Sequence, residues 1–318
     1  MSGTFLRLQG AGIGYGKTPL LSGVCAEFRQ GDFACVVGRN GSGKSTLLRA
    51  LAGIIPYTGS IALGSIAPGG AESRELRAVP HGERARRLSY LPQTRPVPAM
   101  DVRTLLAHGR FPHMGFSKTL SPADRAKIAD AAALAGVGGL LDRSVASLSG
   151  GERQRAYIAL AVAQDADLIL LDEPATYLDV ACQLEIMKLL RALHRSGKGI
   201  VMVSHDLPQA FTVGERIFVA ANGALFPLGS PGEAARNGMI AETFGVCVEA
   251  AQGSREVYAF GLRRTSEFLE ETRSLPVRSA GKAKHGHFTT PDTGTSRPLT
   301  RAPRESLTGM KRCPCGEG

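Results

Sequence analysis

The strongest constraint on the fold is one glycine-rich segment, Gly38-Arg39-Asn40-Gly41-Ser42-Gly43-Lys44-Ser45. It matches the P-loop pattern, and it lies where a P-loop must lie, after a continuous apolar run (Phe33–Val37) and before a helical pattern (Lys44–Ala52). Glycines let backbone N–H groups turn towards phosphates, and a helix N-terminus favours anions. We therefore predict a nucleotide site in which Lys44 contacts the β- and γ-phosphates, Ser45 binds Mg²⁺ and Thr46 completes the phosphate-binding segment.

Strand and helix patterns alternate after the P-loop. Buried strands are predicted at Leu168–Leu171 and Gly199–Val203, and helices at Glu152–Ala163 and Ala181–Arg195. This alternation predicts an α/β fold, namely a P-loop NTPase core with a mainly parallel sheet. Ahead of the core, two short alternating strands (Phe5–Gly14 and Gly23–Gln30) predict an N-terminal antiparallel β subdomain.

A helical insertion is predicted at about residues 95–150, with helices at Val102–His108 and Pro122–Leu134. Two hairpins are predicted further on. The first joins Arg216–Ala220 to Ala224–Leu228 through Asn222-Gly223, and the second joins Val246–Ala250 to Glu256–Phe260. We expect one ATPase-type domain over residues 1–262.

Residues 263–318 are predicted to form a basic, disordered tail, because their composition cannot bury enough apolar surface to offset the entropy of ordering. The net charge is +10, and nine basic against three acidic residues from Arg273 onwards supply +6 of it. A basic tail on a nearly neutral domain favours contact with anionic lipid or nucleotide phosphates over nucleic acid, so no nucleic-acid partner is expected.

The cysteines predict no disulfide or zinc framework. Cys25, Cys35, Cys182 and Cys247 stand apart in apolar contexts, and the Cys313-Pro-Cys315 pair supplies too few ligands for a closed zinc site. No apolar run approaches the ~18–20 residues that a membrane-spanning helix needs. If the protein serves a membrane, the pore is expected on another chain.

A second motif follows the apolar run Leu168–Leu171, which ends in Asp172-Glu173-Pro174. The strand is expected to deliver Asp172 to the edge of the P-loop, where it can hold the water shell of a metal ion. Glu173 is then placed to orient or deprotonate an attacking water. Two solvated acids at a strand end are the alternative, and the P-loop upstream favours the catalytic interpretation.

A third motif, Leu148-Ser149-Gly150-Gly151-Glu152-Arg153-Gln154, begins a predicted helix. Ser149 and Glu152 have the spacing of a capping box, which is the purely structural explanation. A cap does not require two consecutive glycines, whereas a second anion site at a helix N-terminus does benefit from bare backbone. One chain has no use for two γ-phosphate sites, but a dimer does if each copy closes over the ATP of the other.

These motifs together resemble the ATP-binding-cassette (ABC) ATPases, and the resemblance extends over roughly Phe5 to Gly261. Ser149-Gly150-Gly151-Glu152 resembles the signature loop of that family, with Glu152 where many relatives have Gln. Further resemblances are to the loop glutamine, the loop crossing the dimer interface, the switch histidine and the adenine-stacking aromatic: Gln93, Asp179, His205 and Tyr15. Ala175 and Cys182 depart from the usual family residues.

The resemblance implies an ATPase that uses ATP and Mg²⁺ and works as a homodimer. Catalytic roles fall on Lys44, Glu173 and His205, and metal contacts on Ser45, Gln93 and Asp172. Nucleotide contacts fall on Tyr15, the P-loop segment Gly38–Thr46, Gln93, Ser149-Gly150-Gly151-Glu152 and Asp179. It also implies a subunit bound peripherally to the cytoplasmic face of the cell membrane, where it contacts a separate integral membrane permease.

Within the family, Gly109-Arg110-Phe111-Pro112-His113 resembles a segment of ATPases that serve importers of iron-siderophore complexes, haem and cobalamin. This implies iron-siderophore import with a periplasmic or lipid-anchored substrate-binding protein, and haem, cobalamin or another metal chelate as alternatives. A soluble cassette ATPase acting on nucleic acid or ribosomes is disfavoured by the single P-loop and the lack of heptads. A P-loop kinase or switch GTPase is disfavoured by Ser149-Gly150-Gly151 and His205.

Overall fold

The computed structural model describes residues 3–262, apart from 17, 68–69, 116–118 and 251–257. The chain divides into two units, Met1–Leu262 and Arg263–Gly318. The predicted tail and the Cys313-Pro-Cys315 pair lie outside the described residues. Within the described residues, no helix is long and apolar enough to cross a membrane.

The larger sheet has six strands in the described part of the chain, in the order β10-β9-β3-β8-β7-β6. The strands are β3 (Phe33–Val37), β6 (Leu88–Leu91), β7 (Leu168–Asp172), β8 (Gly199–Ser204), β9 (Arg216–Ala221) and β10 (Ala224–Gly229). All neighbours pair in parallel except β9 and β10, which form an antiparallel hairpin. The predicted α/β fold with a mainly parallel sheet is confirmed.

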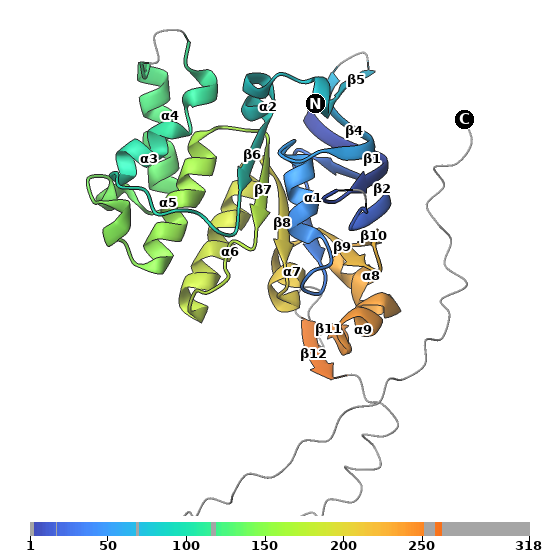
Figure 1. Ribbon diagram of the computed structural model, residues 1–318. Coiled ribbons are helices and arrows are strands. Elements are labelled where there is room, and N and C mark those ends of the chain that lie inside the picture. The colour runs from blue at the N-terminus through green and yellow to red at the C-terminus, as the bar shows by residue number, and fades with distance from the viewer. Residues whose placement is uncertain (1–2, 17, 68–69, 116–118, 251–257, 263–318) are drawn as a thin grey trace, which may run out of the picture. The chain divides into compact units, whose positions relative to one another are not determined.

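Helices cover both faces of this sheet (Figure 1). They are α1 (Lys44–Leu51), α2 (His81–Arg87), α3 (Val102–His108), α4 (Pro122–Leu134), α5 (Gly150–Ala163), α6 (Val180–Arg195), α7 (Leu207–Val213), α8 (Pro231–Arg236) and α9 (Gly238–Phe244). Short 3₁₀ turns lie at Leu76–Ala78, Phe111–His113, Gly138–Leu140 and Val145–Ser147.

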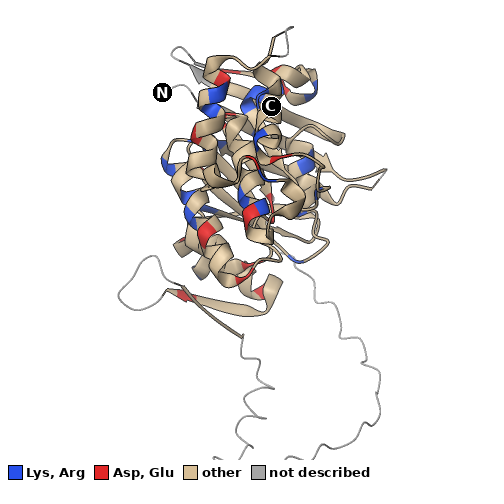
Figure 2. Cartoon of the chain, turned by 90° about the vertical axis from the view of Figure 1, so that its left-hand side faces the viewer, with Lys and Arg blue, Asp and Glu red and all other residues tan. Residues whose placement is uncertain are grey.

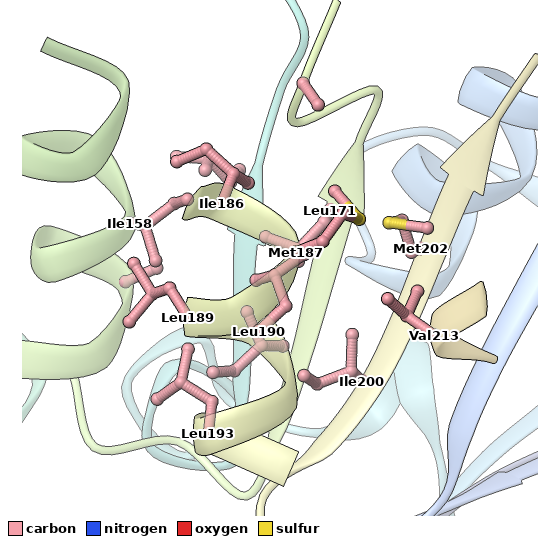
Figure 3. Packing of buried hydrophobic residues seen from close by; sticks show 14 of the residues in the cluster. Ile158, Leu171, Ile186, Met187, Leu189, Leu190, Leu193, Ile200, Met202 and Val213 are labelled. Carbon is pink, nitrogen blue, oxygen red and sulfur yellow. The ribbon is translucent and has the colours of Figure 1, made fainter. Parts of the chain in front are cut away.

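The central strands are apolar throughout because alternate side chains enter two separate cores. Cys35, Leu171 and Met202 face the core that contains α5, α6 and α7. Their neighbours along the strands, such as Val36 and Leu170, face the core that contains α1 and the second sheet. Figure 3 shows the first of these cores, where residues of α6 at helical spacing pack on β7 and β8: Ile186, Met187, Leu190 and Leu193.

The second sheet is antiparallel, with the order β2-β1-β4-β5. Its strands are β1 (Gly3–Ile13), β2 (Leu21–Arg29), β4 (Tyr57–Ala67) and β5 (Gly70–Glu75). The sequence predicted β1 and β2 but neither β4 nor β5. Gly64 of β4 explains part of this, because the ring of Phe5 occupies the space that a Cβ at residue 64 would need. A glycine that packing requires looks like a strand breaker in the sequence.

The helical insertion contains α3 and α4 at their predicted bounds. Its two chain ends are hydrogen-bonded to each other: Val102 N donates to Arg143 O (3.1 Å), Arg103 N to Leu141 O (2.9 Å) and Val145 N to Met100 O (2.9 Å). We call these paired ends, residues 100–103 and 141–145, the neck. The insertion is therefore closed at its base.

Both predicted hairpins exist. Asn222 and Gly223 join β9 to β10 with φ values of 51° and 74°, as a two-residue hairpin turn requires. Strand β11 (Val246–Ala250) pairs with β12 (Tyr258–Leu262), which starts two residues later than the predicted 256. The residues of that turn lie outside the described ranges.

Candidate functional site

A pocket of about 470 Å³ lies where the chain leaves β3, β7 and β8 at their carboxyl ends. Ligand sites of open α/β sheets form at this edge. The pocket is lined by P-loop residues and by residues from four other segments: Leu20, Asn40, Gly41, Ser42, Gly43, Lys44, Ser45, Thr46, Gln93, Glu173, Thr176, Tyr177 and His205. The pocket thus brings together half of the residues for which the sequence predicted nucleotide contact, together with Glu173 and His205, for which it predicted catalytic roles.

The P-loop backbone has a shape that only glycine permits at two positions. Gly43, the N-cap of α1, has a φ of 92°, which side chains disfavour. A Cβ on Gly38 would lie 2.5 Å from the carbonyl oxygen of Ala220 on β9. The loop is therefore seated against the sheet, with α1 starting at Lys44.

Lys44 is 5% exposed, and its Nζ donates to the carbonyl oxygens of Gly38 (2.8 Å) and Arg39 (3.0 Å). Burial lowers its pKa, and the charges of Glu173 and Asp172 oppose that shift. The buried hydroxyl of Ser42 has no hydrogen-bond partner among the described residues. A buried amine and an unsatisfied hydroxyl beside a helix N-terminus fit a phosphate group.

Ser45 and Asp172 form the candidate magnesium site. Ser45 Oγ donates to Asp172 Oδ1 at 2.8 Å, and Asp172 is 3% exposed. Burial raises the pKa of Asp172, the hydrogen bond from Ser45 opposes the shift, and the charge of Glu173 adds to it. Among the described residues no three His, Cys, Asp or Glu gather to hold a metal. One carboxylate and one hydroxyl fit Mg²⁺ that arrives with phosphate ligands.

Glu173 is the centre of a polar cluster. Its Oε2 accepts from Gln93 Nε2 (2.8 Å) and Thr176 Oγ1 (3.0 Å), and it lies 3.0 Å from Nδ1 of His205. Its backbone N–H donates to Val203 O at 3.0 Å, and its φ of 50° is rare for a residue with a side chain. Strained backbone of this kind is concentrated at functional sites.

Thr176 is a pocket residue that the sequence analysis missed. The backbone N–H of Thr176 donates to Glu173 O at 3.3 Å and closes a short turn. This turn brings the Thr176 hydroxyl within hydrogen-bond distance of the Glu173 carboxylate. A threonine three residues after the acid is the only signal in the sequence, and such a signal is weak. Tyr177, the next residue, also lines the pocket although it is 94% exposed.

Tyr15 is not among the residues that line the pocket. It is 54% exposed, and its hydroxyl accepts from Arg49 Nη1 at 2.8 Å. Arg49 belongs to the last turn of α1. The structure therefore places Tyr15 beside the helix that the P-loop begins, away from the phosphate end of the site.

The Ser149–Glu152 segment also lies outside the lining of the pocket. Ser149 N donates to Glu152 Oε2 (2.9 Å) and Glu152 N donates to Ser149 Oγ (3.3 Å), so the capping box is present at the start of α5. Gln154, one turn on, donates to the carbonyl oxygen of Pro174 at 2.5 Å. The helix that Ser149 caps is thereby tied to the turn that carries Glu173.

Asp179 caps α6, where its carboxylate accepts from Cys182 N at 2.8 Å. It too lies outside the pocket lining. Exposed apolar side chains flank it, namely Tyr177 (94% exposed), Val180 (71%) and Leu184 (56%). Large apolar residues clustered on a surface are typical of a contact with another macromolecule.

The segment Gly109–His113 turns its polar side chains inward. Arg110 donates to Asp124 Oδ1 and to the carbonyl oxygen of Ala163, both at 2.8 Å, and His113 Nε2 lies 2.8 Å from the carbonyl oxygen of Gln164. These contacts satisfy the last carbonyls of α5. Only Phe111, which is 58% exposed, is presented outwards as a large side chain.

The site combines the buried Lys44 of a P-loop with the Ser45–Asp172 pair and with Glu173, which Gln93 and His205 contact. This combination is typical of a P-loop nucleotide hydrolase. The family is shown by comparison: the ABC transporter family matches residues 21–176. The chain is 36% identical over 235 residues to the petrobactin import ATP-binding protein of Bacillus anthracis, covering 73% of this chain and 83% of the relative. It is 34% identical over 251 residues to the ferric enterobactin transport ATP-binding protein of Escherichia coli, covering 77% and 90%. The chain therefore belongs to the ABC transporter family, as an ATP-binding and ATP-hydrolysing member.

Solved structures agree with this assignment. A metal-chelate type ABC transporter in an inward-facing conformation matches with a TM-score of 0.65 and 25% identity, over 81% of this chain and 96% of that one. A nucleotide-free ATP-binding cassette from an ABC transporter matches with a TM-score of 0.65 and 20% identity, over 76% and 97%. The second likeness confirms the fold alone.

Proposed function

We propose that this chain energises a membrane importer of iron-siderophore complexes by hydrolysing ATP, and that residues 1–262 are its ATPase domain. The cluster of Gln93, Glu173 and His205 beside the P-loop carries the ATPase part of the proposal. The substrate rests on relatives at 33–36% identity that are named for the import of petrobactin, enterobactin and iron-hydroxamate.

The proposed cycle uses two copies of the chain. Lys44 and Ser42 would hold the phosphates, and Ser45, Asp172 and Gln93 would hold Mg²⁺. Glu173 would act on water, and His205 would contact the γ-phosphate. Ser149 and Asp179 lie outside their own chain's pocket, and exposed Tyr177, Val180 and Leu184 adjoin Asp179. Both observations support a homodimer in which these residues reach the nucleotide of the other copy.

The remaining partners follow from the importer. A separate permease is proposed to span the membrane, with this subunit on its cytoplasmic face and a substrate-binding protein on the other side. Figure 2 shows basic and acidic residues interspersed along the helices on this side of the domain, which supports a protein partner more than a nucleic acid. Haem import is the second candidate, because the hemin import ATP-binding protein of Streptomyces coelicolor is 35% identical over 241 residues.

The test is complementation in a strain that lacks this chain. Uptake of a radiolabelled ferric siderophore should return with the wild-type chain and not with Glu173→Gln, while uptake of haem and cobalamin should be unaffected by the deletion. Co-purification should recover a polytopic membrane protein. Loss of haem uptake alone would move the assignment to the second candidate. ATP hydrolysis that needs nucleic acid, without a membrane partner, would refute import altogether.

A further inference from the structure

A chain of polar contacts connects Tyr15 to Asp172 through Arg49 and Tyr90, two residues that have no assigned role. Arg49 donates to the hydroxyl of Tyr15 at 2.8 Å, and its guanidinium also lies beside the hydroxyl of Tyr90. Tyr90 in turn donates to Asp172 Oδ2 at 3.5 Å. Because a guanidinium can only donate, the Tyr90 oxygen accepts from Arg49 and its proton is left for Asp172.

The fold puts these groups on one side of the sheet. Tyr90 of β6 stands opposite Leu170 of β7, and Asp172 follows two residues later on the same face of the strand. Ser45 and Arg49 are four residues apart, so they share one face of α1. Two adjacent strands and one helix therefore present four polar side chains to a single place.

The two oxygens of Asp172 are each held by a different hydroxyl. Oδ1 accepts from Ser45 at 2.8 Å, and Oδ2 is turned to Tyr90. The terminal torsion of an aspartate has broad minima, so packing at Cβ alone does not fix the plane of the carboxylate. The hydroxyl of Tyr90 supplies the second point that fixes it, and Arg49 holds that hydroxyl in place.

We propose that Tyr90 and Arg49 are positioning residues that orient Asp172 for Mg²⁺ bound with nucleotide; this rests on the proposed ATPase site. Neither residue lines the pocket. Tyr90 and Arg49 increase the nucleotide affinity that is gained when Mg²⁺ is present. They do not change the affinity for nucleotide without metal.

The test is the affinity for a non-hydrolysable ATP analogue, measured by calorimetry on the full chain with Mg²⁺ and with EDTA. Tyr90→Phe keeps the ring and removes the hydroxyl. One hydrogen bond is worth about 0.5–1.5 kcal/mol net, so the affinity gained from Mg²⁺ should fall roughly two- to tenfold, with no change in EDTA. Arg49→Met, at an exposed position, should shift the same quantity and guards against a folding defect in the first variant.

The matched control is Tyr57→Phe. Tyr57 also donates to a carboxylate, Glu75 Oε1 at 2.6 Å, but it lies in the antiparallel sheet outside the pocket lining. This variant should leave both affinities unchanged. The inference would be overturned if Tyr90→Phe and Arg49→Met left the affinity gained from Mg²⁺ unaltered, or if they lowered the affinity equally in EDTA. The same loss of affinity in Tyr57→Phe would also overturn it. A wild-type chain that binds no nucleotide under either condition would instead overturn the proposed function.

Discussion

Nδ1 of His205 lies 3.0 Å from Oε2 of Glu173, the same oxygen that accepts the side-chain N–H of Gln93 at 2.8 Å. His205 follows β8 and Gln93 follows β6, so residues after three different strands meet at one carboxylate oxygen. The position of the Glu173 carboxylate is therefore tied to the positions of two other loops.

Replacing Glu173 by Gln should separate ATP binding from hydrolysis. The change removes the proposed general base and keeps the side-chain shape. Base assistance is typically worth ~10²–10⁴-fold, so turnover should fall by about that factor while ATP still binds. A closed dimer should then accumulate with ATP, and size-exclusion chromatography of the isolated subunit measures it.

Adding Ser149→Arg to this variant tests the signature loop. A bulky cation would replace the small cap that is proposed to face the nucleotide of the partner copy, so the ATP-dependent dimer should not form. Equal dimerisation of both variants would reduce Ser149 to the helix cap that its bonds with Glu152 already show. A Glu173→Gln variant that binds ATP and stays monomeric would make the dimer dependent on the permease.

Tyr15→Ala should raise the KM for ATP by roughly tenfold or more, if the ring stacks on adenine. Stacking of an aromatic side chain on a base is worth ~1–3 kcal/mol in single-strand binders. Tyr15→Phe keeps the ring and loses only the contact with Arg49, so its effect should be mild. Unchanged nucleotide affinity in the Ala variant, measured in the same assay, would remove Tyr15 from the site.

Arg110→Met should destabilise the protein by about 3 kcal/mol, because it leaves the carboxylate of Asp124 without its cation. The side chains of Arg110 and Asp124 are 7% and 9% exposed. Phe111→Ser, at the neighbouring exposed position, is the control and should cost less than about 0.5 kcal/mol. Denaturant unfolding measures both, and a similar cost for the two variants would contradict the buried ion pair.

The same ion pair predicts a pH dependence. Hydrogen bonds from Ser121 and Arg110 lower the pKa of Asp124 from 3.8 to about 2. A carboxylate with a depressed folded-state pKa stabilises the fold above its unfolded pKa and loses that effect as the pH falls through the folded value. The difference in stability between wild type and Arg110→Met should therefore shrink below about pH 4. A difference that stays constant down to pH 2 would exclude Asp124 as its source.

Gly109→Ala should lower the melting temperature, because the new Cβ would lie 2.7 Å from the carbonyl oxygen of Leu160 in α5. Gly138→Ala, in the same insertion, is a matched control with no atom within 4 Å of the new Cβ. We expect a cost of about 1–3 kcal/mol for the first and almost none for the second. Two equally stable variants would show that α5 can move away from residue 109.

The sequence predicted the strands that appear as continuous apolar runs and the helices that begin at a recognisable capping residue. The continuous apolar runs of β3, β7 and β8 arise because both faces of each strand are covered, and α3 and α4 begin at capping residues. It did not predict β4, β5 or β6. Strand β6 has only four residues, and β4 contains Gly64, where a Cβ would collide with the ring of Phe5 in β1. The contact between residues 64 and 5 forms only when the chain folds, so the sequence alone does not show it.

The site divides in a similar way. The P-loop, Asp172 and Glu173 are local motifs, so the sequence located them and the structure places them in or beside one pocket. Tyr90 lies next to Asp172 only in space, so no spacing along the chain indicates it, and the one signal for Thr176 is its place three residues after Glu173. Tyr15 and Ser149 lie outside the pocket lining, so their proposed nucleotide contacts stay predictions.

The neck pairs residues 100–103 with residues 141–145 at the base of the helical insertion. Joined ends keep their distance from each other whatever lies between them, but residues between them, such as Gly109 and Arg110, also contact α5 outside the insertion. An exchange of residues 104–140 between relatives would leave the joined ends in place, and it would have to preserve the contacts of Gly109 and Arg110 with α5.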